Sequence, residues 1–297
     1  MNKSACIILN YNNYTDTIKC VKNVFAIGAL VDVVVVDNAS PNNSFEVISN
    51  CFAGLSNFFL IKAEKNLGYA AGNNVGIRYI EKNLPNVEFI FIMNPDTLFD
   101  DPKVITQTEQ TFNENNLYAV VAPVMKERGI PQLEKTAWKI PSGFRLVLLQ
   151  LMFFNKKKNY CNAAENMGTI EVDAVSGSFF AIRLDALKKI GYLDENTFLY
   201  CEETLLGIKL KKLGLKEVVM VDTYFHHNHP PLSKSRNVTL ASRIRREMAC
   251  DMKSRIYICR NFYPRVYLPF LYVTSVMNLL YVCLIHLGFL TKKLLMK

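Results

Sequence analysis

Hydrophobic and polar positions follow two alternating patterns along the first part of the chain. Four apolar runs have the length of a strand and break at polar residues, namely SACIILNY, VDVVVVDNAS, NFFLIKA and VEFIFIMNPDTLF. Between the third and fourth runs, KNLGYAAGNNVGIRYI has the apolar spacing of a helix. Continuous apolar strands separated by helices are typical of a parallel sheet covered on both faces. We therefore expect an α/β fold with a Rossmann-like, mostly parallel sheet flanked by helices.

The pattern is less regular from about residue 113 to residue 169, which favours an insertion. Within this region, LVLLQLMFF follows Arg145 and is closed by three consecutive lysines two residues later. Such a run is either a core helix with a solvated end or an element that contacts a membrane. After Val172 the alternation resumes, and it predicts a strand, a helix, a loop and a second helix.

Polar residues follow three of the predicted strands at the points where those strands end. Open parallel sheets bind ligands beyond the carboxyl ends of their strands, so we expect these residues to converge on one nucleotide site. They are Asn10, Tyr11 and Asn12 after the first run, Asp37 and Asn38 after the second, and Asn94 and Asp96 after the fourth.

Asp37 ends a strand that is otherwise apolar, where a carboxylate needs a partner. Its oxygens could accept hydrogen bonds from a base or a ribose. The alternative is a local role, in which Asp37, Asn38 and Ser40 cap the turn that follows. The residue alone leaves the two interpretations open.

Asn94-Pro95-Asp96 ends the strand VEFIFIM. Asp96 could supply an oxygen ligand for Mn²⁺ or Mg²⁺, ions that bind few carboxylates together with substrate phosphates. A plain Pro-Asp turn is the alternative. The position of Asp96 opposite Asp37 favours the metal ligand.

Two adjacent carboxylates, Glu202 and Glu203, follow an aromatic run and open a predicted helix. Acidic residues at a helix start are favourable without any catalytic role. Two carboxylates in one site also tend to separate in pKa, which leaves one suited to accept a proton. We predict Glu203 as the catalytic base, with Glu202 orienting it or contacting an acceptor.

Three histidines lie close together in YFHHNHPPLSKSR, at positions 226, 227 and 229. Their clustering in a proline-bearing loop suggests that at least one contacts a metal or a phosphate. We place His227 first and His229 second.

Glycines recur at a regular spacing of four in NLGYAAGNNVG, at Gly68, Gly72 and Gly76. The spacing does not match a dinucleotide-binding GxGxxG motif, and on a helix it permits close packing against a sheet. Asn66 and Asn73 are the polar residues there that could reach a nucleotide. A further tight turn at Gly177 and Ser178 could let an acceptor approach the backbone, and we predict both as acceptor-binding residues.

The chain of 297 residues has a formal net charge of +9, concentrated between Lys209 and Arg265. Such a block attracts diphosphates, acidic lipids or nucleic acid. No nucleic-acid motif accompanies it, so we exclude nucleic acid as a partner. The eight cysteines are scattered without a CxxC pair, which suits a reducing compartment. The start of the sequence lacks the apolar core of a secretory signal, so we expect a cytoplasmic location.

An apolar stretch, VYLPFLYVTSVMNLLYVCLIHLGFL, follows the basic block over residues 266–290. Its length would suffice for a membrane helix, and its tyrosines suit an interface. We predict a helical extension at 237–297 that associates with a membrane surface, after a main domain at 1–236. A buried helix pair or a homodimer contact is the alternative.

Together these motifs resemble glycosyltransferase family 2, the inverting enzymes of GT-A fold, and its bacterial rhamnosyltransferase-like members in particular. The resemblance rests on the ordered series IILNYNN, VVVVDNASPN, KNLGYAAGNNVGI, FIMNPD, VSGSFFAIR, GYLDENTFLYCEE and HHNHPPLS. It implies a metal-dependent inverting hexosyltransferase with Mn²⁺ or Mg²⁺ at the DXD-like Asp96. It also implies a dTDP- or UDP-sugar donor, held by the strand-end residues and by Asn66, Gly68 and Asn73. The base would be the second residue of an acidic pair.

The sequence departs from the family pattern at that acidic pair. Glu203 stands where the family usually has aspartate, and TLLGIKLKK replaces the usual continuation. The longer side chain puts the position of the base in question, since catalysis depends on placement. A catalytically inactive scaffold of a membrane glycan-assembly complex is therefore one alternative.

A sugar nucleotidyltransferase is a second alternative, although IILNYNNYTD lacks the basic glycine-rich loop such enzymes need for a triphosphate. For the enzyme we expect a lipid-linked or polysaccharide acceptor at the cytoplasmic face of the membrane. The basic and apolar elements near the C-terminus would hold the active site near it. The pathway would be synthesis of a bacterial cell-surface polysaccharide, such as a capsule, O-antigen or exopolysaccharide.

Overall fold

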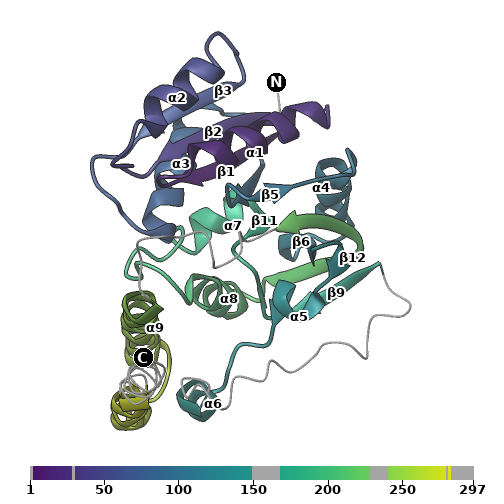
Figure 1. Ribbon diagram of the computed structural model, residues 1–297. Helices are drawn as coiled ribbons and strands as arrows, with labels where there is room; N and C mark the ends of the chain where they lie inside the picture. Colours follow the sequence, from purple (N-terminus) through teal and green to yellow (C-terminus); the bar gives the residue numbers. More distant parts are fainter. Residues whose placement is uncertain (1–2, 29–30, 149–167, 228–239, 279, 282–297) are drawn as a thin grey trace. The chain divides into compact units, whose positions relative to one another are not determined.

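The computed structural model describes residues 3–28, 31–148, 168–227, 240–278 and 280–281 (Figure 1). These residues divide into two compact units. The first holds the sheet and most of the chain up to residue 227. The second combines residues 141–148 and 199–201 with the described residues from 240 onward. The domain boundary predicted at residue 236 lies outside the described residues.

The first half of the sheet consists of parallel strands in the order β3-β2-β1-β4. Their bounds are β1 (Ser4–Asn10), β2 (Val31–Asp37), β3 (Phe58–Lys62) and β4 (Phe89–Met93), and the helices between them are α1 (Tyr14–Ala26), α2 (Ser44–Cys51) and α3 (Tyr69–Asn83). All four predicted strands and the helix are confirmed. Asn10 lies opposite Asp37 in the register, so the two strands end level with each other.

Two hydrophobic cores cover the two faces of this half-sheet, which explains why its strands are continuously apolar. Ile7 and Ile77 of α3 belong to one core. Ile8 belongs to the other, together with Val21 of α1. Successive side chains of a strand point to opposite faces, and here both faces are covered by helices (Figure 1).

The second half of the sheet is mixed, which corrects the prediction of a mostly parallel sheet. Strand β11 (Phe179–Arg183) runs antiparallel to both β4 and β6 (Tyr118–Glu127), while β12 (Lys216–His227) runs parallel to β6. At the margins are β5 (Thr97–Leu98), β7 (Ile130–Pro131) and β9 (Thr169–Val172). Strand pairing depends on contacts distant in sequence, and no local pattern announces the reversed direction of β11.

The region predicted as an insertion begins with a central strand instead. Strand β6 lies between β11 and β12, and every residue from Ala119 to Met125 is buried. Pro123 lacks an amide for the ladder, and it pairs with Met220, next to a register shift in β12. This proline within an otherwise apolar run concealed the strand in the sequence.

Shorter elements complete the first unit. A separate two-stranded sheet pairs β8 (Ala137–Trp138) with β10 (Ala174–Val175). The helices are α4 (Val104–Glu114), α5 (Leu133–Thr136), α7 (Leu184–Lys189) and α8 (Glu202–Lys212). The strand, helix, loop and helix predicted after Val172 are thus confirmed as β11, α7, the connecting loop and α8.

The second unit is built from helices. They are α6 (Gly143–Leu148), α9 (Leu240–Phe262), the short 3-10 helix η3 (Arg265–Tyr267) and a helical stretch at 268–278. The ring of Tyr267 packs so closely on Gly143 that a Cβ there would approach it to 2.3 Å. Among the described residues, no helix combines the length and apolar character needed to cross a bilayer.

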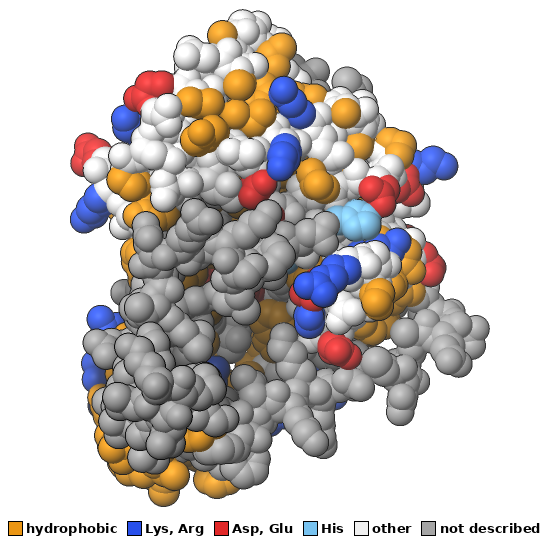
Figure 2. Space-filling model, in the orientation of Figure 1, with side chains coloured by type: hydrophobic (Ala, Val, Ile, Leu, Met, Phe, Trp, Pro, Cys, Tyr) orange, Lys and Arg blue, Asp and Glu red, His pale blue; other side chains and the backbone are white. Residues whose placement is uncertain are grey.

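The helical stretch at 268–278 has its polar and apolar residues reversed relative to an ordinary surface helix. Thr274, Ser275 and Asn278 are buried. Most of the large apolar residues there and just beside it are exposed, although Leu271 is fully buried, and apolar side chains gather on this unit at the lower left of Figure 2. The exposed residues are Val266, Phe270, Tyr272, Val273, Val276, Met277 and Leu280.

Candidate active site

The ends of β1 and β2 are joined by hydrogen bonds between buried side chains. The amide nitrogen of Asn10 donates to Asp37 Oδ2 at 2.7 Å, and the backbone amide of Ser40 donates to Asp37 Oδ1 at 2.9 Å. Both Asn10 and Asp37 are fully buried. Of the two interpretations of Asp37, the hydrogen bond to the following turn is present in the structure. A contact with a nucleotide stays a prediction.

The loop after β1 is tied to the loop after β2. The backbone amide of Asn12, a residue with a φ of 60°, donates to the Ser40 hydroxyl at 2.8 Å. Tyr11 beside it is 48% exposed, so its ring is available to a ligand at this edge of the sheet. The predicted residues of these two strand ends therefore lie together.

Asn38 connects the end of β2 to the start of α3. Its side-chain nitrogen donates to Asn66 Oδ1 at 3.2 Å and to the Gly68 carbonyl at 3.1 Å, while its oxygen accepts from the Leu67 amide at 3.0 Å. The structure thus brings Asn38, Asn66 and Gly68 together. Asn73 is fully buried inside α3, and its amide group donates to the Tyr69 carbonyl at 3.0 Å.

The three regularly spaced glycines have two different roles. Gly72 and Gly76 lie on α3, where an added Cβ would come within 3 Å of Leu9 and Ile7. Their predicted close packing on the sheet is confirmed. Gly68 is not within the helix but is its N-cap, with a φ of 80°, and a Cβ there would lie 2.2 Å from the Phe198 carbonyl oxygen.

Asp96 and His227 are brought together from distant parts of the sequence. Asp96 lies in a turn after β4, closed by the Thr97 amide donating to the Asn94 carbonyl at 3.1 Å. Strand β12 ends at His227, which is paired with Thr97 of β5. His227 Nε2 consequently lies 3.1 Å from Asp96 Oδ1. The turn predicted as an alternative is present, and so is the approach of the two predicted metal ligands.

This pair is compatible with a divalent metal. Neighbouring ligand atoms of an octahedral Mg²⁺ lie about 3 Å apart, because each is about 2.1 Å from the ion. The separation of 3.1 Å between His227 Nε2 and Asp96 Oδ1 is that of a direct ion pair, and it is also close to this value. The described residues contain no cluster of three or more protein ligands, so a metal here would need donor phosphates to complete its shell. His229 lies outside the described residues, and His226 pairs with Asp100 at 2.5 Å.

Glu203 lies in the first turn of α8 and faces the turn at Gly177. Its Oε1 accepts a hydrogen bond from the Gly177 amide at 3.0 Å, and a Cβ on Gly177 would lie 2.9 Å from the same oxygen. The hydroxyl of Tyr69 donates to the Gly177 carbonyl at 2.5 Å. Burial, then the charges of Glu203 and Glu202, raise the pKa of Tyr69 well above its usual value. The hydroxyl therefore stays protonated as a donor.

Gly177 and Ser178 link Glu203 to the loop that carries Asp96. The Ser178 carbonyl accepts from the Asn94 amide at 2.8 Å and from the Thr97 hydroxyl at 3.0 Å. The amide of the preceding residue, Gly177, donates to Glu203 Oε1. The Ser178 hydroxyl lies 2.9 Å from that of Ser176. This short segment thus connects the predicted base and the predicted metal ligand.

Sequence reasoning missed two residues of this region. Tyr69 follows the helical pattern of α3, so nothing marked its hydroxyl as different from that of any surface tyrosine. Glu217 lies at the start of β12, is 2% exposed and accepts from the Val175 amide at 3.0 Å. The feature of the sequence that could have revealed Glu217 is its position, since it is a carboxylate at the second position of an otherwise largely apolar strand.

Comparison with known proteins identifies the family of the chain. The profile of glycosyl transferase family 2 matches residues 5–191, a range that includes most of β1, all of β2 and β4, the turn at Asp96 and the segment at Gly177. The chain belongs to glycosyl transferase family 2.

Two proteins of known function are similar in sequence to this family 2 chain. The low-salt glycan biosynthesis hexosyltransferase Agl10 of Haloferax volcanii is 28% identical over 232 residues, which cover 76% of this chain and 67% of that protein. The rhamnosyltransferase WbbL of Escherichia coli K12 is 21% identical over 151 residues. That match covers 50% of this chain and 56% of WbbL, so the chain spans little more than half of it.

The fold of the family 2 chain resembles that of solved glycosyltransferases. The mannosyltransferase PcManGT from Pyrobaculum calidifontis, solved in complex with GDP-Man and Mn²⁺, superposes with a TM-score of 0.60 at 13% identity. The match covers 92% of this chain and 69% of that protein. At this identity the likeness establishes the mixed α/β fold alone.

Proposed function

We propose that this chain transfers a hexose or deoxyhexose, such as rhamnose or galactose, from a nucleotide sugar to a lipid-linked or polysaccharide acceptor. The product would enter a cell-surface polysaccharide. The observation that supports the proposal best is the segment at Gly177 and Ser178. It holds the Glu203 carboxylate by the Gly177 amide and the Asp96 loop by the Ser178 carbonyl. In this proposal, a base for the acceptor and a site for the diphosphate are held by the same short segment.

Glu203 is the base in this proposal. Its carboxylate removes the proton from an acceptor hydroxyl, whose oxygen forms a bond to the anomeric carbon while the bond from that carbon to the diphosphate breaks. Attack from the side opposite the leaving group inverts the anomeric configuration. The Gly177 amide fixes one oxygen of Glu203, whose side chain is one methylene longer than the aspartate usual in the family.

Asp96 and His227 would hold a divalent ion, Mn²⁺ or Mg²⁺, together with the donor diphosphate. A bound ion supplies positive charge that neutralises the leaving diphosphate. The structure of PcManGT contains GDP-Man and Mn²⁺, which supports the same class of donor and ion here. The loops at Asn10–Asn12, Asp37–Asn38 and Asn66–Gly68 form the adjoining edge, where we place the nucleotide.

The reversed helix at 268–278 supports a membrane-associated acceptor. Val273 and Val276 are 58% and 57% exposed, and Ser275 on the opposite side is buried. A helix whose apolar residues face outward is stabilised where that face meets lipid. Arg265 is exposed at the start of this apolar stretch and suits an acidic lipid surface. We place this surface at the cytoplasmic face of a membrane; a second copy of the chain is the alternative occupant.

The decisive experiment offers the purified chain a panel of nucleotide sugars, namely UDP-glucose, UDP-galactose, UDP-GlcNAc, GDP-mannose and dTDP-rhamnose, each with Mn²⁺ and then with chelator. Release of the nucleoside diphosphate, with and without extracted lipid-linked saccharides, measures both hydrolysis and transfer. We expect one donor to be turned over in a metal-dependent way. Stabilisation by a donor without any turnover would instead support the inactive scaffold.

A further inference from the structure

The segment 174–178 has two edges, and only one of them pairs with a strand. Ala174 and Val175 of β10 pair with β8, and the Ser176 amide continues the ladder to the Thr136 carbonyl at 2.7 Å. Within the described residues, this small sheet contains only these two strands. The amides of Val175 and Gly177 therefore need other acceptors.

Two carboxylates take the place of the missing strand. The Val175 amide donates to Glu217 Oε2 at 3.0 Å, and the Gly177 amide donates to Glu203 Oε1 at 3.0 Å. In an extended chain, amides two residues apart point to the same side, which accounts for this spacing. Glu217 and Glu203 thus act on the same short piece of backbone from different elements, β12 and α8.

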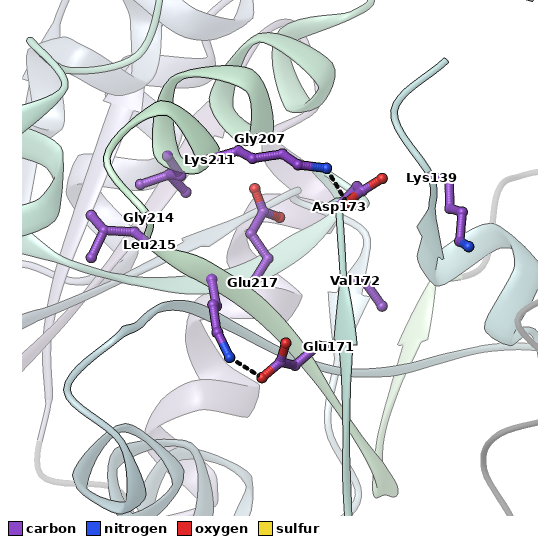
Figure 3. A pocket seen from close by; sticks show the side chains of 11 residues that line it. Lys139, Glu171, Val172, Asp173, Gly207, Lys211, Gly214, Leu215 and Glu217 are labelled. Carbon is purple, nitrogen blue, oxygen red and sulfur yellow. Dashed lines mark hydrogen bonds and ion pairs between the residues drawn. The ribbon is translucent and has the colours of Figure 1, made fainter. Parts of the chain in front are cut away.

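Glu217 is buried between β12, α8 and Asp173. Figure 3 shows its side chain beside a cavity of about 390 Å³, with Gly207 of α8 and Lys211 nearby. Gly207 packs so closely that a Cβ there would lie 2.1 Å from the Asp173 carbonyl oxygen. The Oε1 atom of Glu217 is buried without a hydrogen-bond partner in the described part of the chain. Burying a carboxyl group in this way costs free energy, so a buried carboxyl group with an unpaired oxygen calls for an explanation.

The charge state of Glu217 fits a role as a fixed acceptor. Burial, aided by the negative charges of Asp173 and Glu203, raises the pKa of Glu217 well above its usual value, although the Val175 amide opposes the shift. The shift favours the neutral, protonated form of the carboxyl group. That form repels the Glu203 carboxylate less and still accepts from the Val175 amide.

We propose that Glu217 is a positioning residue for Glu203. By accepting the hydrogen bond from the Val175 amide, Glu217 fixes the segment 174–178. The Gly177 amide then points toward the Glu203 carboxylate. The inference rests on the proposed role of Glu203 as the base. Without Glu217, the segment is free to shift, and a displacement of about 1 Å in a catalytic group can lower kcat on the order of 100-fold.

The test compares Glu217→Ala and Glu217→Gln, with Glu171→Gln as the matched control. Glu171 lines the same cavity but is exposed and pairs with Lys216. The substrate is whichever nucleotide sugar of the panel is turned over by the wild type. Trp138, the single tryptophan of the chain, lies opposite Ala174, so its fluorescence reports directly on the segment.

We expect Glu217→Ala to lower kcat on the order of 10- to 100-fold, with little change in KM for the donor and a changed Trp138 emission. Glu217→Gln keeps an oxygen for the Val175 amide and should stay near wild-type kcat. Glu171→Gln should match the wild type throughout. If Glu217→Ala does not fold, Glu217→Asp, which withdraws the carboxyl group by one methylene, takes its place with the same expectation of a lower kcat.

Three outcomes would overturn the positioning role. One is a folded Glu217→Ala, or Glu217→Asp, with wild-type kcat. Another is an equal loss in Glu217→Gln, since its acceptor oxygen is retained. The third is an equal loss in Glu171→Gln, which would indicate a general effect of the cavity. A wild type that turns over none of the panel donors would overturn the proposed function instead, and Trp138 emission in the variants would still show whether Glu217 fixes the segment.

Discussion

His227 Nε2 lies 3.1 Å from Asp96 Oδ1, although one residue ends β12 and the other follows β4. The contact exists because β5, which follows Asp96 directly, pairs with the last residues of β12. A ladder of only two residue pairs therefore brings this carboxylate and this imidazole together. This geometry makes both residues accessible to a sharp experimental test.

Replacing either residue should weaken the activation of the enzyme by metal. We expect Asp96→Asn and His227→Asn each to weaken activation by Mn²⁺ about 10-fold or more, because each removes one ligand. Titration of activity with Mn²⁺ measures the effect. Asp100→Asn is the matched control, since Asp100 is an exposed carboxylate just after β5 that pairs with His226 instead. Equal losses in the control, or full activity after chelation, would contradict a metal at Asp96.

Replacing the proposed base should abolish transfer without abolishing donor binding. Glu203→Gln keeps an oxygen for the Gly177 amide but cannot accept the proton, so kcat should fall about 100- to 10,000-fold. Thermal shift with UDP or GDP and Mn²⁺ checks that donor binding persists. Glu203→Asp should retain more activity than Glu203→Gln because it is still a base. Undiminished turnover in Glu203→Gln would remove Glu203 from the mechanism.

Gly68 should tolerate no side chain. Its φ of 80° disfavours other residues, and a Cβ would also collide with the Phe198 carbonyl at 2.2 Å. Gly54, with a φ of 84° and open space around it, isolates the first effect. We expect Gly54→Ala to lower the free energy of unfolding by about 1 kcal/mol and Gly68→Ala by clearly more. Urea denaturation measures both free energies of unfolding. Equal losses in the two variants would mean that the backbone at Phe198 moves away from the added Cβ at no cost.

The stability of the protein should decline as pH rises through the folded-state pKa of Glu217. Burial raises that pKa above the ordinary value of 4.5, so folding takes up a proton in the range between the two values. The stabilising contribution is complete below the unfolded pKa and is lost above the folded one, with a slope of up to about 1.4 kcal/mol per pH unit. Glu217→Gln should remove this part of the decline. Parallel urea midpoints for wild type and variant across pH would contradict it.

The exposed face of the 268–278 helix should mediate binding to acidic lipid. We expect the double variant Val273→Asp, Val276→Asp to bind phosphatidylglycerol vesicles about 10-fold more weakly or worse, since charges enter lipid at high cost. Flotation with the vesicles measures it. Leu213→Asp, at a residue 51% exposed beyond α8, is the control. Loss of a dimer in light scattering, with vesicle binding unchanged, would assign the face to a second copy.

The sequence predicted most of what local patterning determines. The strands ending at Asn10, Asp37 and Met93 were evident because both faces of the half-sheet are buried. The packing of Gly72 and Gly76 was evident because small residues at helical spacing have few other uses. Asp96 and His227 were each predicted as metal ligands, and the structure places them side by side.

Properties that depend on distant contacts could not be predicted. The direction of β11 is set by its two neighbours, β4 and β6, rather than by its own residues. Strand β6 was hidden by Pro123, whose missing amide is tolerated beside an irregularity of the partner strand. Glu217 was overlooked because its role depends on the unpaired edge of a strand formed elsewhere, at Val175.

Strand β12 has an irregularity between Met220 and Tyr224, and the number of residues there sets which histidine comes to lie beside Asp96. It adds residues to β12 that have no counterpart in β6, and the strand beyond them ends with His226 and His227. Side chains alternate along a strand, so loss or gain of a single residue here would exchange the places of the two histidines. Relatives with an insertion or deletion at this point should therefore differ in which histidine, if any, faces the aspartate of the β4 turn.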